Sequence, residues 1–227
     1  MEHNDEFAIA RKLIDERELS DQYLETAHDI LADLIEQNPG CGWAYGLLSE
    51  IYYWSGENAE ADEKMFYYGE GVSWGEQGVE ADEDSVEANF WLAVNWGSFG
   101  QEKGIMKSLS LVTPIKETIE FVIEKDERFF YGGPWRVLGR LYHRAPGFPF
   151  SIGDNKKAEE CLKRALELGP NFYLNHLFLA ELYISEGRRM QAREELEWIL
   201  NAEPNRNHER EDKGYKVMAA ELLEKNL

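Results

Sequence analysis

Three arginines recur at every fourth position near the middle of the chain, at Arg136, Arg140 and Arg144. On a helix this spacing places all three on one face. A guanidinium group binds a carboxylate through two parallel hydrogen bonds, so such a stripe is suited to recognising acidic groups. His143 lies in the same stretch. These residues are the best candidates in the chain for binding a ligand or partner.

No pattern of catalytic or metal-binding residues accompanies the stripe. The five histidines form no HExxH pair, and no GxSxG or CxxC motif is present. With 44 acidic residues in the chain, any two carboxylates can lie close by chance, so such pairs indicate nothing. We therefore expect a protein that is not an enzyme, with no metal site and no cofactor.

The elements that position the stripe are predicted to be helices in a repeated pair. Windows upstream of Pro39, Pro170 and Pro204 carry small and large apolar residues at matching offsets: Ala27, Leu31 and Leu34; Ala158, Leu162 and Ala165; Ala192 and Leu196. Small residues let two helices approach, and proline then ends the second helix. Pro170 and Pro204 are 34 residues apart, which sets the period of the repeat.

The first helices of the pairs also match, with Leu179, Ala180 and Tyr183 spaced like Leu138, Gly139 and Tyr142. This pattern resembles the tetratricopeptide repeat (TPR). The resemblance implies an all-α, right-handed solenoid of antiparallel helix pairs, forming a single domain over 1–227. We expect the pairs at about 5–39, 42–82, 85–126, 133–170 and 173–204, and a terminal capping helix at 206–226.

Repeat proteins of this type bind partners along the face formed by the first helices of the pairs. The residues expected on that face are Trp43, Glu50, Tyr53, Trp54, Phe90, Arg136, Arg140, His143, Arg144 and Glu181. Two interpretations remain open. Either the arginines pair with glutamates such as Glu50 and Glu181 while the aromatic residues pack between repeats, or the face binds a ligand with an apolar body and a carboxylate.

Two departures from the repeat stand out. Gly71, Gly75 and Gly78 fall on one helical face, and we expect them to allow close helix packing rather than to leave room for a ligand. Seven residues are inserted between the two helices of the fourth pair. The insertion contains Phe148 and Phe150, which we expect to fold back against the solenoid, to close one end of the binding face, or to form an interface.

Charge is uneven along the chain, whose net charge is −20. Residues 1–100 hold 23 acidic and 4 basic side chains, which argues against a nucleic-acid partner. No apolar run is long enough to span a membrane, and Cys41 and Cys161 are too few for a disulfide framework. The chain as given carries no leader, so we expect a cytoplasmic protein, or a periplasmic one if a leader was removed. Homo-oligomers are compatible with this charge pattern.

A longer series of motifs is more specific. EANFWLAVNWG at 87–97 is followed by GGPWRVLGRLYHRAPGFP at 132–149 and KAEECLKRALELGPNFYLNHLFLAE at 157–181. This order resembles the T-component proteins of TRAP transporters. The resemblance implies a periplasmic, lipid-anchored helical protein that can form trimers. Its partner would be a solute-binding protein for hydrophobic or organic-acid ligands. We therefore expect a non-catalytic scaffold for a protein or peptide partner, or alternatively a transport-accessory protein that binds a small hydrophobic acid.

Overall fold

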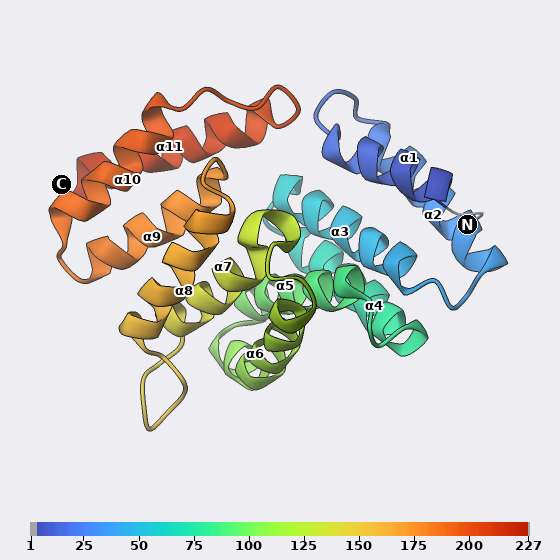
Figure 1. Cartoon of the computed structure of the whole chain (residues 1–227), viewed down its shortest axis with the longest axis horizontal. Coiled ribbons are helices and arrows are strands. Elements are labelled where there is room, and N and C mark those ends of the chain that lie inside the picture. Colours follow the sequence, from blue (N-terminus) through green and yellow to red (C-terminus); the bar gives the residue numbers. More distant parts are fainter. Residues whose placement is uncertain (1–3, 227) are drawn as a thin grey trace. The chain divides into compact units, whose positions relative to one another are not determined.

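The computed structural model describes residues 4–226, and the described chain consists of helices and loops without a strand (Figure 1). The helices are α1 (Asn4–Asp15), α2 (Tyr23–Gln37), α3 (Gly42–Asn58), α4 (Lys64–Ala81), α5 (Val86–Lys103), α6 (Ile105–Asp126), α7 (Phe129–Arg144), α8 (Asn155–Leu168), α9 (Tyr173–Ser185), α10 (Arg189–Asn201) and α11 (Glu209–Asn226). This order confirms the expected all-α fold of paired helices.

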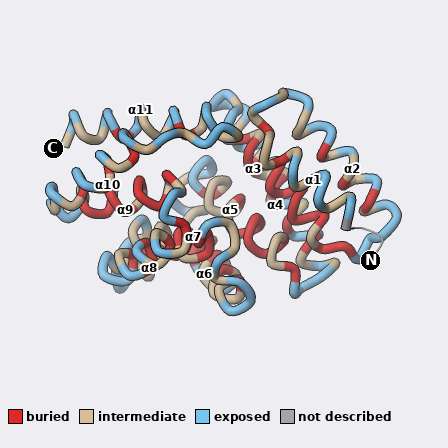
Figure 2. Tube along the Cα trace, turned by 45° about the horizontal axis from the view of Figure 1, so that its top comes forward, coloured by how far each residue is buried: buried red, intermediate tan, exposed pale blue. Residues whose placement is uncertain are grey.

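The chain divides into two compact units. Unit 1 is Met1–Lys125 and unit 2 is Asp126–Leu227. Each unit has buried residues along the inner sides of its helices, drawn in red in Figure 2. How the repeats join into one domain stays a prediction, and the two units are described separately below.

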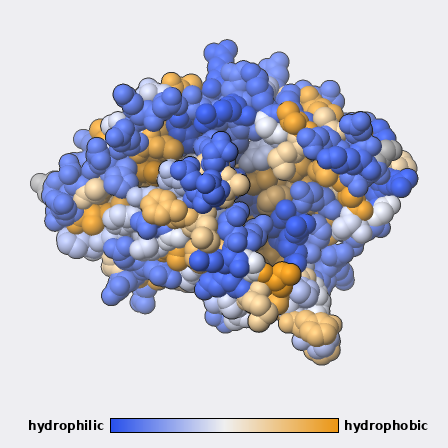
Figure 3. Space-filling model, turned by 180° about the vertical axis from the view of Figure 1, so that it is seen from behind, coloured by the Kyte–Doolittle hydropathy of each residue, from blue (hydrophilic) through white to orange (hydrophobic). Residues whose placement is uncertain are grey.

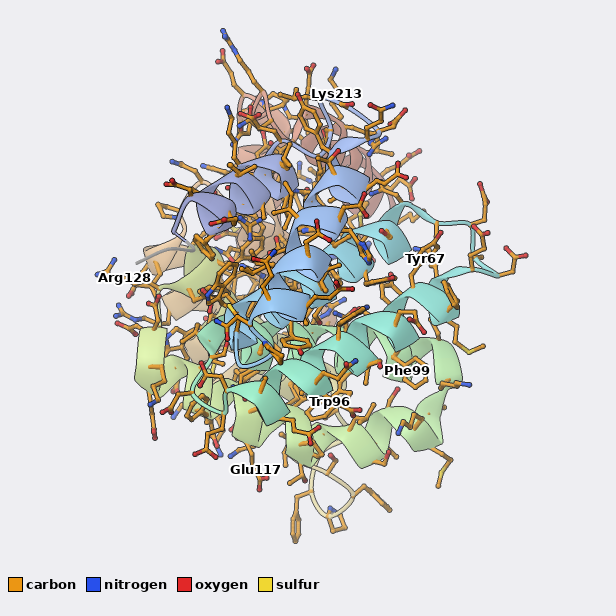
Figure 4. The ribbon with its side chains drawn as sticks, turned by 90° about the vertical axis from the view of Figure 1, so that its right-hand side faces the viewer. Tyr67, Trp96, Phe99, Glu117, Arg128 and Lys213 are labelled. Carbon is orange, nitrogen blue, oxygen red and sulfur yellow. The ribbon has the colours of Figure 1, made fainter. Side chains whose placement is uncertain are left out.

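Glycines form the packing seam of unit 1. A Cβ atom added to Gly71 would lie 2.5 Å from the side chain of Asn95, and one added to Gly75 would lie 2.8 Å from Leu92. One added to Gly78 would lie 2.8 Å from Ala88. All three neighbours belong to α5, so the glycine face of α4 allows α5 to approach closely, as the sequence predicted. The outer surface of this pair carries Tyr67, Trp96 and Phe99, labelled in Figure 4.

Two buried polar side chains join the same three helices. The Ser49 hydroxyl of α3 donates to the carbonyl of Gly71 at 2.7 Å. The Asn95 amide of α5 donates to the Ser49 carbonyl at 2.9 Å and to the Ser49 hydroxyl oxygen at 3.0 Å. A buried polar group costs free energy unless it is paired, so these bonds fix the register of the helices as well as their separation.

Two connections between helices of unit 1 are short. Residues 59–63 separate α3, which ends at Asn58, from α4, which begins at Lys64. Helix α5 ends at Lys103 and α6 begins at Ile105, separated only by Gly104 with a φ of 95°. A positive φ favours glycine, which explains how so short a joint is made.

Unit 2 consists of the pairs α7–α8 and α9–α10 followed by α11. Ala158, Leu162 and Ala165 are buried along α8, on the face expected from the repeat. A second core cluster joins α9, α10 and α11 through Leu177, Leu196 and other apolar side chains. Because α11 contributes to this cluster, it covers the last helix pair in the manner of a cap.

The beginning of α7 is a left-handed turn. Phe130, Tyr131 and Gly132 have φ values of 46°, 60° and 73° before the regular helix continues through Pro134. Non-glycine residues adopt this conformation at a cost of about 1 kcal/mol each. The surrounding structure must therefore hold the turn in place, and its contacts belong to the site described next.

The segment between α7 and α8 forms a loop that stands away from the helices of unit 2 (Figure 1). Phe148 and Phe150 were expected to fold back against the solenoid or to form an interface. The packing prediction is wrong, because their side chains are 93% and 83% exposed. The backbone explains the difference. Hydrogen bonds from Gly153 N to the Pro146 carbonyl (2.9 Å) and from Asp154 N to the Tyr142 carbonyl (3.0 Å) close the base of the loop. Its tip therefore points outward.

Candidate functional site

Helices α7 and α9 of unit 2 contact each other through a series of polar and aromatic pairs. We call this surface the α7–α9 face, made of Arg136, Arg140 and His143 from α7 and Asn175, Phe178, Glu181 and Ser185 from α9. The pairs follow one another every three to four residues on both helices. Such regular spacing results from two helices lying side by side in the same direction.

Arg136 lies at the buried end of the face. Its side chain is 4% exposed, and its Nη1 donates to Asn175 Oδ1 at 3.0 Å. The guanidinium also stacks over Phe172, 4.5 Å from the ring centre. A buried charge is tolerated only when its donors are satisfied, so Arg136 is held by polar and cation–π contacts together.

Asn175 secures the left-handed turn at the beginning of α7. Its Nδ2 atom donates to the carbonyls of Tyr131 (3.1 Å), Ala165 (3.0 Å) and Gly169 (2.9 Å). Tyr131 in turn stacks on Phe172, with ring centres 5.0 Å apart. One buried amide therefore joins three chain segments, and it compensates for the backbone strain that the turn introduces.

Arg140 occupies the middle of the face and is half-buried. Its Nη1 forms an ion pair with the Glu181 carboxylate, and its guanidinium lies 4.1 Å from the ring centre of Phe178. This arrangement holds a cation between a carboxylate and an aromatic ring. It is the geometry that a guanidinium uses to bind an acidic group beside an apolar surface.

His143 and Arg144 form the outer end. His143 Nε2 lies 3.2 Å from the Ser185 hydroxyl, and burial, followed by the charges of Arg140 and Arg144, lowers the pKa of His143 below its usual value of 6.5. The imidazole is therefore largely neutral at pH 7. Arg144 is exposed, and no carboxylate of the described chain lies within ion-pair distance of it.

The candidate residues of α3 in unit 1 have a different environment, because α1 and the turn after it cover them. Trp43 packs edge-on against Phe7 at 4.9 Å, and Glu50 forms a two-fold ion pair with Arg11. The guanidinium of Arg17 lies 3.6 Å above the Trp54 ring. The side chain of Glu50 is fully buried, so it serves helix packing within unit 1.

The remaining aromatic candidates also pack inside unit 1. Tyr53 lies 4.9 Å from Trp54 and 5.4 Å from Trp91, and Phe90 lies 5.1 Å from Trp91, all between ring centres. Phe90 is 1% exposed. These contacts form an aromatic core between α3 and α5.

The structure thus brings Arg136, Arg140, His143 and Glu181 together in unit 2, while the aromatic candidates gather in unit 1. Sequence reasoning missed Asn175, Phe172 and Phe178. One signal was available for the first of them, since Asn175 is a polar residue inside the apolar stretch YLNHLFLAELY. The ring of Phe178 could not be assigned, because it lies one position away from the residues that the repeat pattern places on the face.

Two features are absent from residues 4–226. No three histidine, cysteine, aspartate or glutamate side chains in that range are grouped so that they could hold a metal ion. None of its helices combines the length and the apolar character needed to cross a bilayer.

Comparison with known proteins identifies a family. The sequence profile of the TRAP transporter T-component family matches residues 58–211 of the chain. This range includes α4 to α10 and both helices of the α7–α9 face.

Curated relatives and solved structures extend the comparison. Regulator of microtubule dynamics protein 1 of Homo sapiens is 26% identical over 182 residues, which cover 73% of this chain and 55% of that protein. The Bos taurus protein is 28% identical over 179 residues, covering 71% and 54%. The chain thus spans about half the length of these relatives.

The solved structures show the fold. A thermophilic TPR protein of Thermus thermophilus superimposes with a TM-score of 0.68 at 17% identity, covering 96% of this chain and 100% of that one. The pilF protein of Pseudomonas aeruginosa gives a TM-score of 0.57 at 14% identity, covering 96% and 92%. The helical repeats are therefore of the TPR type.

Proposed function

Because this chain belongs to the TRAP transporter T-component family, we propose that it is a non-catalytic binding protein that holds an acidic segment of a protein partner on its α7–α9 face. TPR-type repeats commonly act as interaction scaffolds. The family suggests the solute-binding protein of the same transporter as that partner.

The observation that carries the proposal is the environment of two arginines, Arg140 and Arg144. Arg140 is half-buried between Glu181 and the ring of Phe178, and Arg144 is exposed one turn further along. A partner carboxylate could bind Arg144 directly, or replace Glu181 at Arg140. Replacing one carboxylate by another leaves the guanidinium paired, so the exchange avoids the large cost of leaving a buried charge alone.

Binding of the purified solute-binding protein to the full chain tests this directly by surface plasmon resonance. We expect Arg144→Glu to weaken binding about tenfold or more, because a like charge then faces the acidic segment. Arg140→Gln should weaken it as well, since the neutral amide loses the ionic contact. Arg206→Glu is the matched control, because Arg206 is exposed in the loop between α10 and α11, outside the face.

These binding measurements decide whether the partner binds the α7–α9 face. Loss of binding in the two face variants with full binding by Arg206→Glu supports the α7–α9 face as the binding surface. Equal binding by wild type and all three variants would contradict the proposal that the partner binds the α7–α9 face. Far-UV circular dichroism of each variant checks that the helices remain folded.

A second function is favoured by the rings that lie under the guanidinium groups. Phe172 beneath Arg136 and Phe178 beneath Arg140 place apolar surface next to positive charge. A small hydrophobic acid has the complementary form, an apolar body with a carboxylate. Native mass spectrometry of protein purified from its own host should then show a bound acid. An apo mass, together with no thermal shift in fatty or organic acids, would contradict this alternative.

A further inference from the structure

The tip of the loop between α7 and α8 carries the two most exposed large hydrophobic side chains of residues 4–226. We call residues 147–150 the loop tip. Phe148 is 93% exposed and Phe150 is 83% exposed, with Pro149 between them. Figure 3 shows the loop as an apolar knob at the lower right of the molecule. Soluble surfaces rarely place two such side chains together without a partner.

Backbone hydrogen bonds hold the loop in a shape that leaves the side chains of Phe148 and Phe150 exposed. Phe150 N donates to the Gly147 carbonyl at 3.1 Å inside the tip, while Gly153 and Asp154 close the base. A Cβ atom on Gly153 would lie 2.1 Å from the Ala145 carbonyl oxygen, so only glycine fits there. The loop is therefore a shaped turn that holds both phenylalanine side chains outward, and Figure 4 shows it projecting at the bottom of the view.

Basic residues flank the base of the loop. Arg144 ends α7, and Lys156 and Lys157 begin α8; all three are exposed. Between Arg144 and Lys157 the chain holds one carboxylate, Asp154, whose Oδ1 accepts hydrogen bonds from the backbone N–H groups of Lys156 and Lys157 as the cap of α8. The same segment holds three basic side chains, Arg144, Lys156 and Lys157. The base of the loop is therefore locally cationic, although the whole chain is acidic.

The apolar area of the loop tip helps to distinguish a protein partner from a lipid bilayer. Two phenylalanine side chains offer roughly 200 Å² each, whereas a stable protein interface needs about 800 Å² from each side. A lipid bilayer has no such minimum, since its interface accepts single aromatic side chains while headgroup phosphates attract nearby cations. The combination of a small apolar tip and a cationic base favours lipid.

We propose that the loop tip inserts Phe148 and Phe150 into the surface of an anionic phospholipid bilayer, while Arg144, Lys156 and Lys157 contact the lipid phosphates. The protein would attach to the surface without crossing the membrane. This inference does not depend on the α7–α9 face as a partner-binding surface, although Arg144 has a part in both proposals; the variants used below therefore leave Arg144 unchanged.

Co-sedimentation of the full chain with sucrose-loaded vesicles tests the proposal. One set of vesicles contains phosphatidylcholine and phosphatidylglycerol at 3:1, and the other contains phosphatidylcholine alone. We expect wild type to bind the anionic vesicles more strongly. The double change Phe148→Ser and Phe150→Ser should lower partitioning by roughly tenfold per side chain. Because both side chains are exposed, the fold is expected to tolerate the change.

Two further variants separate the apolar and ionic contributions. Phe66→Ser is the matched control, because Phe66 is 61% exposed on α4 in unit 1, and it should bind like wild type. The double change Lys156→Gln and Lys157→Gln should lower binding to anionic vesicles several-fold and leave binding to phosphatidylcholine vesicles unchanged. High salt should have the same effect as this variant.

Three outcomes would overturn the inference. They are no binding of wild type to either vesicle, equal binding by wild type and the loop-tip double variant, and an equal loss in Phe66→Ser. If the loop-tip variant loses binding to the solute-binding protein while wild type ignores vesicles, the tip is a protein contact and the lipid proposal is wrong.

Discussion

Glu50 is a buried charge that is paired across two helices. Its carboxylate is fully buried, accepts two hydrogen bonds from Arg11, and accepts another from Trp54 Nε1 at 3.1 Å. A carboxylate removed from water must recover its hydration through such bonds. Glu50 therefore links α1 to α3 through Arg11. Replacing Glu50 alone would leave Arg11 without this carboxylate.

We expect Glu50→Ala to lower the free energy of unfolding by about 3 kcal/mol, because one member of a buried ion pair is removed. Urea unfolding followed by circular dichroism measures the change. Glu76→Ala is the control, since Glu76 is exposed on α4, and it should change the stability by less than about 0.5 kcal/mol. Identical urea midpoints for wild type and Glu50→Ala would contradict the role given to this pair.

A second ion pair predicts how stability depends on pH. Glu159 accepts hydrogen bonds from Arg188 at 2.6 and 2.8 Å and pairs with Lys163. The Arg188 bonds are the main cause that lowers the pKa of Glu159 from 4.5 to about 2. Since the unfolded carboxyl binds its proton at higher pH, this stabilisation is present above pH 4.5 and is lost as the pH falls towards 2.

Glu159→Gln should therefore flatten the loss of stability between pH 5 and pH 2.5 relative to wild type. Thermal unfolding at a series of pH values measures the slope. Glu160→Gln, a change at the exposed neighbouring position, should keep the wild-type slope. Parallel curves for wild type and Glu159→Gln would show that the pair does not contribute.

At the scale of helices, glycine forms the contact between α4 and α5, whereas alanine and leucine form the contact between α9 and α10. The α4 glycines place α5 within contact distance of the α4 backbone, and any added side-chain atom must displace α5. In the α9–α10 pair the corresponding contacts involve Ala180, Ala192 and Leu196, all buried. The size of the side chains at a helix crossing sets how closely the two helices can approach.

Two glycine substitutions with the same effect on helix propensity should have opposite outcomes. A Cβ at Gly75 would lie 2.9 Å from the backbone Cα of Leu92, so Gly75→Ala should destabilise the protein by about 1–2 kcal/mol. Nothing lies within 4 Å of a Cβ at Gly97, so Gly97→Ala should stabilise it by about 0.5–1 kcal/mol. Urea midpoints measure both. A stabilised Gly75→Ala variant would show that the seam has room.

Most helices were predictable from the sequence because the residues that begin and end each helix lie next to it in the chain. Asp154 caps α8 and the apolar period carries it to Leu168, so its range follows from neighbouring residues alone. The outward loop tip was not predictable, since hydrophobic side chains normally pack inside. Backbone bonds at Gly153 and Asp154 decide its direction, and the sequence pattern carries no sign of them.

For the whole molecule, each unit has its own buried core. Unit 2 encloses Leu162 between α7 and α8 and Leu177 and Leu196 among α9, α10 and α11. A chain segment with its own core can fold alone. The candidate site lies within this unit. The repeat pattern offered both the pairing of Arg140 with Glu181 and the packing of the aromatic residues between repeats, but only as one of two interpretations. It could not decide between packing and ligand binding, because that depends on tertiary contacts such as those of Trp54 and Phe90 in unit 1.

The fragment Asp126–Leu227, produced alone, should therefore be helical and unfold cooperatively. Circular dichroism during heating provides the measurement, and Leu196→Ala in the same fragment should lower the midpoint by removing a fully buried side chain. A fragment with little helix and no transition would show that unit 2 requires unit 1 for folding.

The close contact between α4 and α5 also limits how a protein of this kind can gain repeats. Repeat arrays grow by duplication when any repeat can stack on any other, because each then offers the same interface. Here α5 accepts only a neighbour with glycine opposite Ala88, Leu92 and Asn95. A duplicated copy of α9–α10 inserted after α3 would bring side chains to those points and hold α5 away. The contact between α4 and α5 is therefore specific to these two helices, and a copied helix pair cannot replace α4 beside α5.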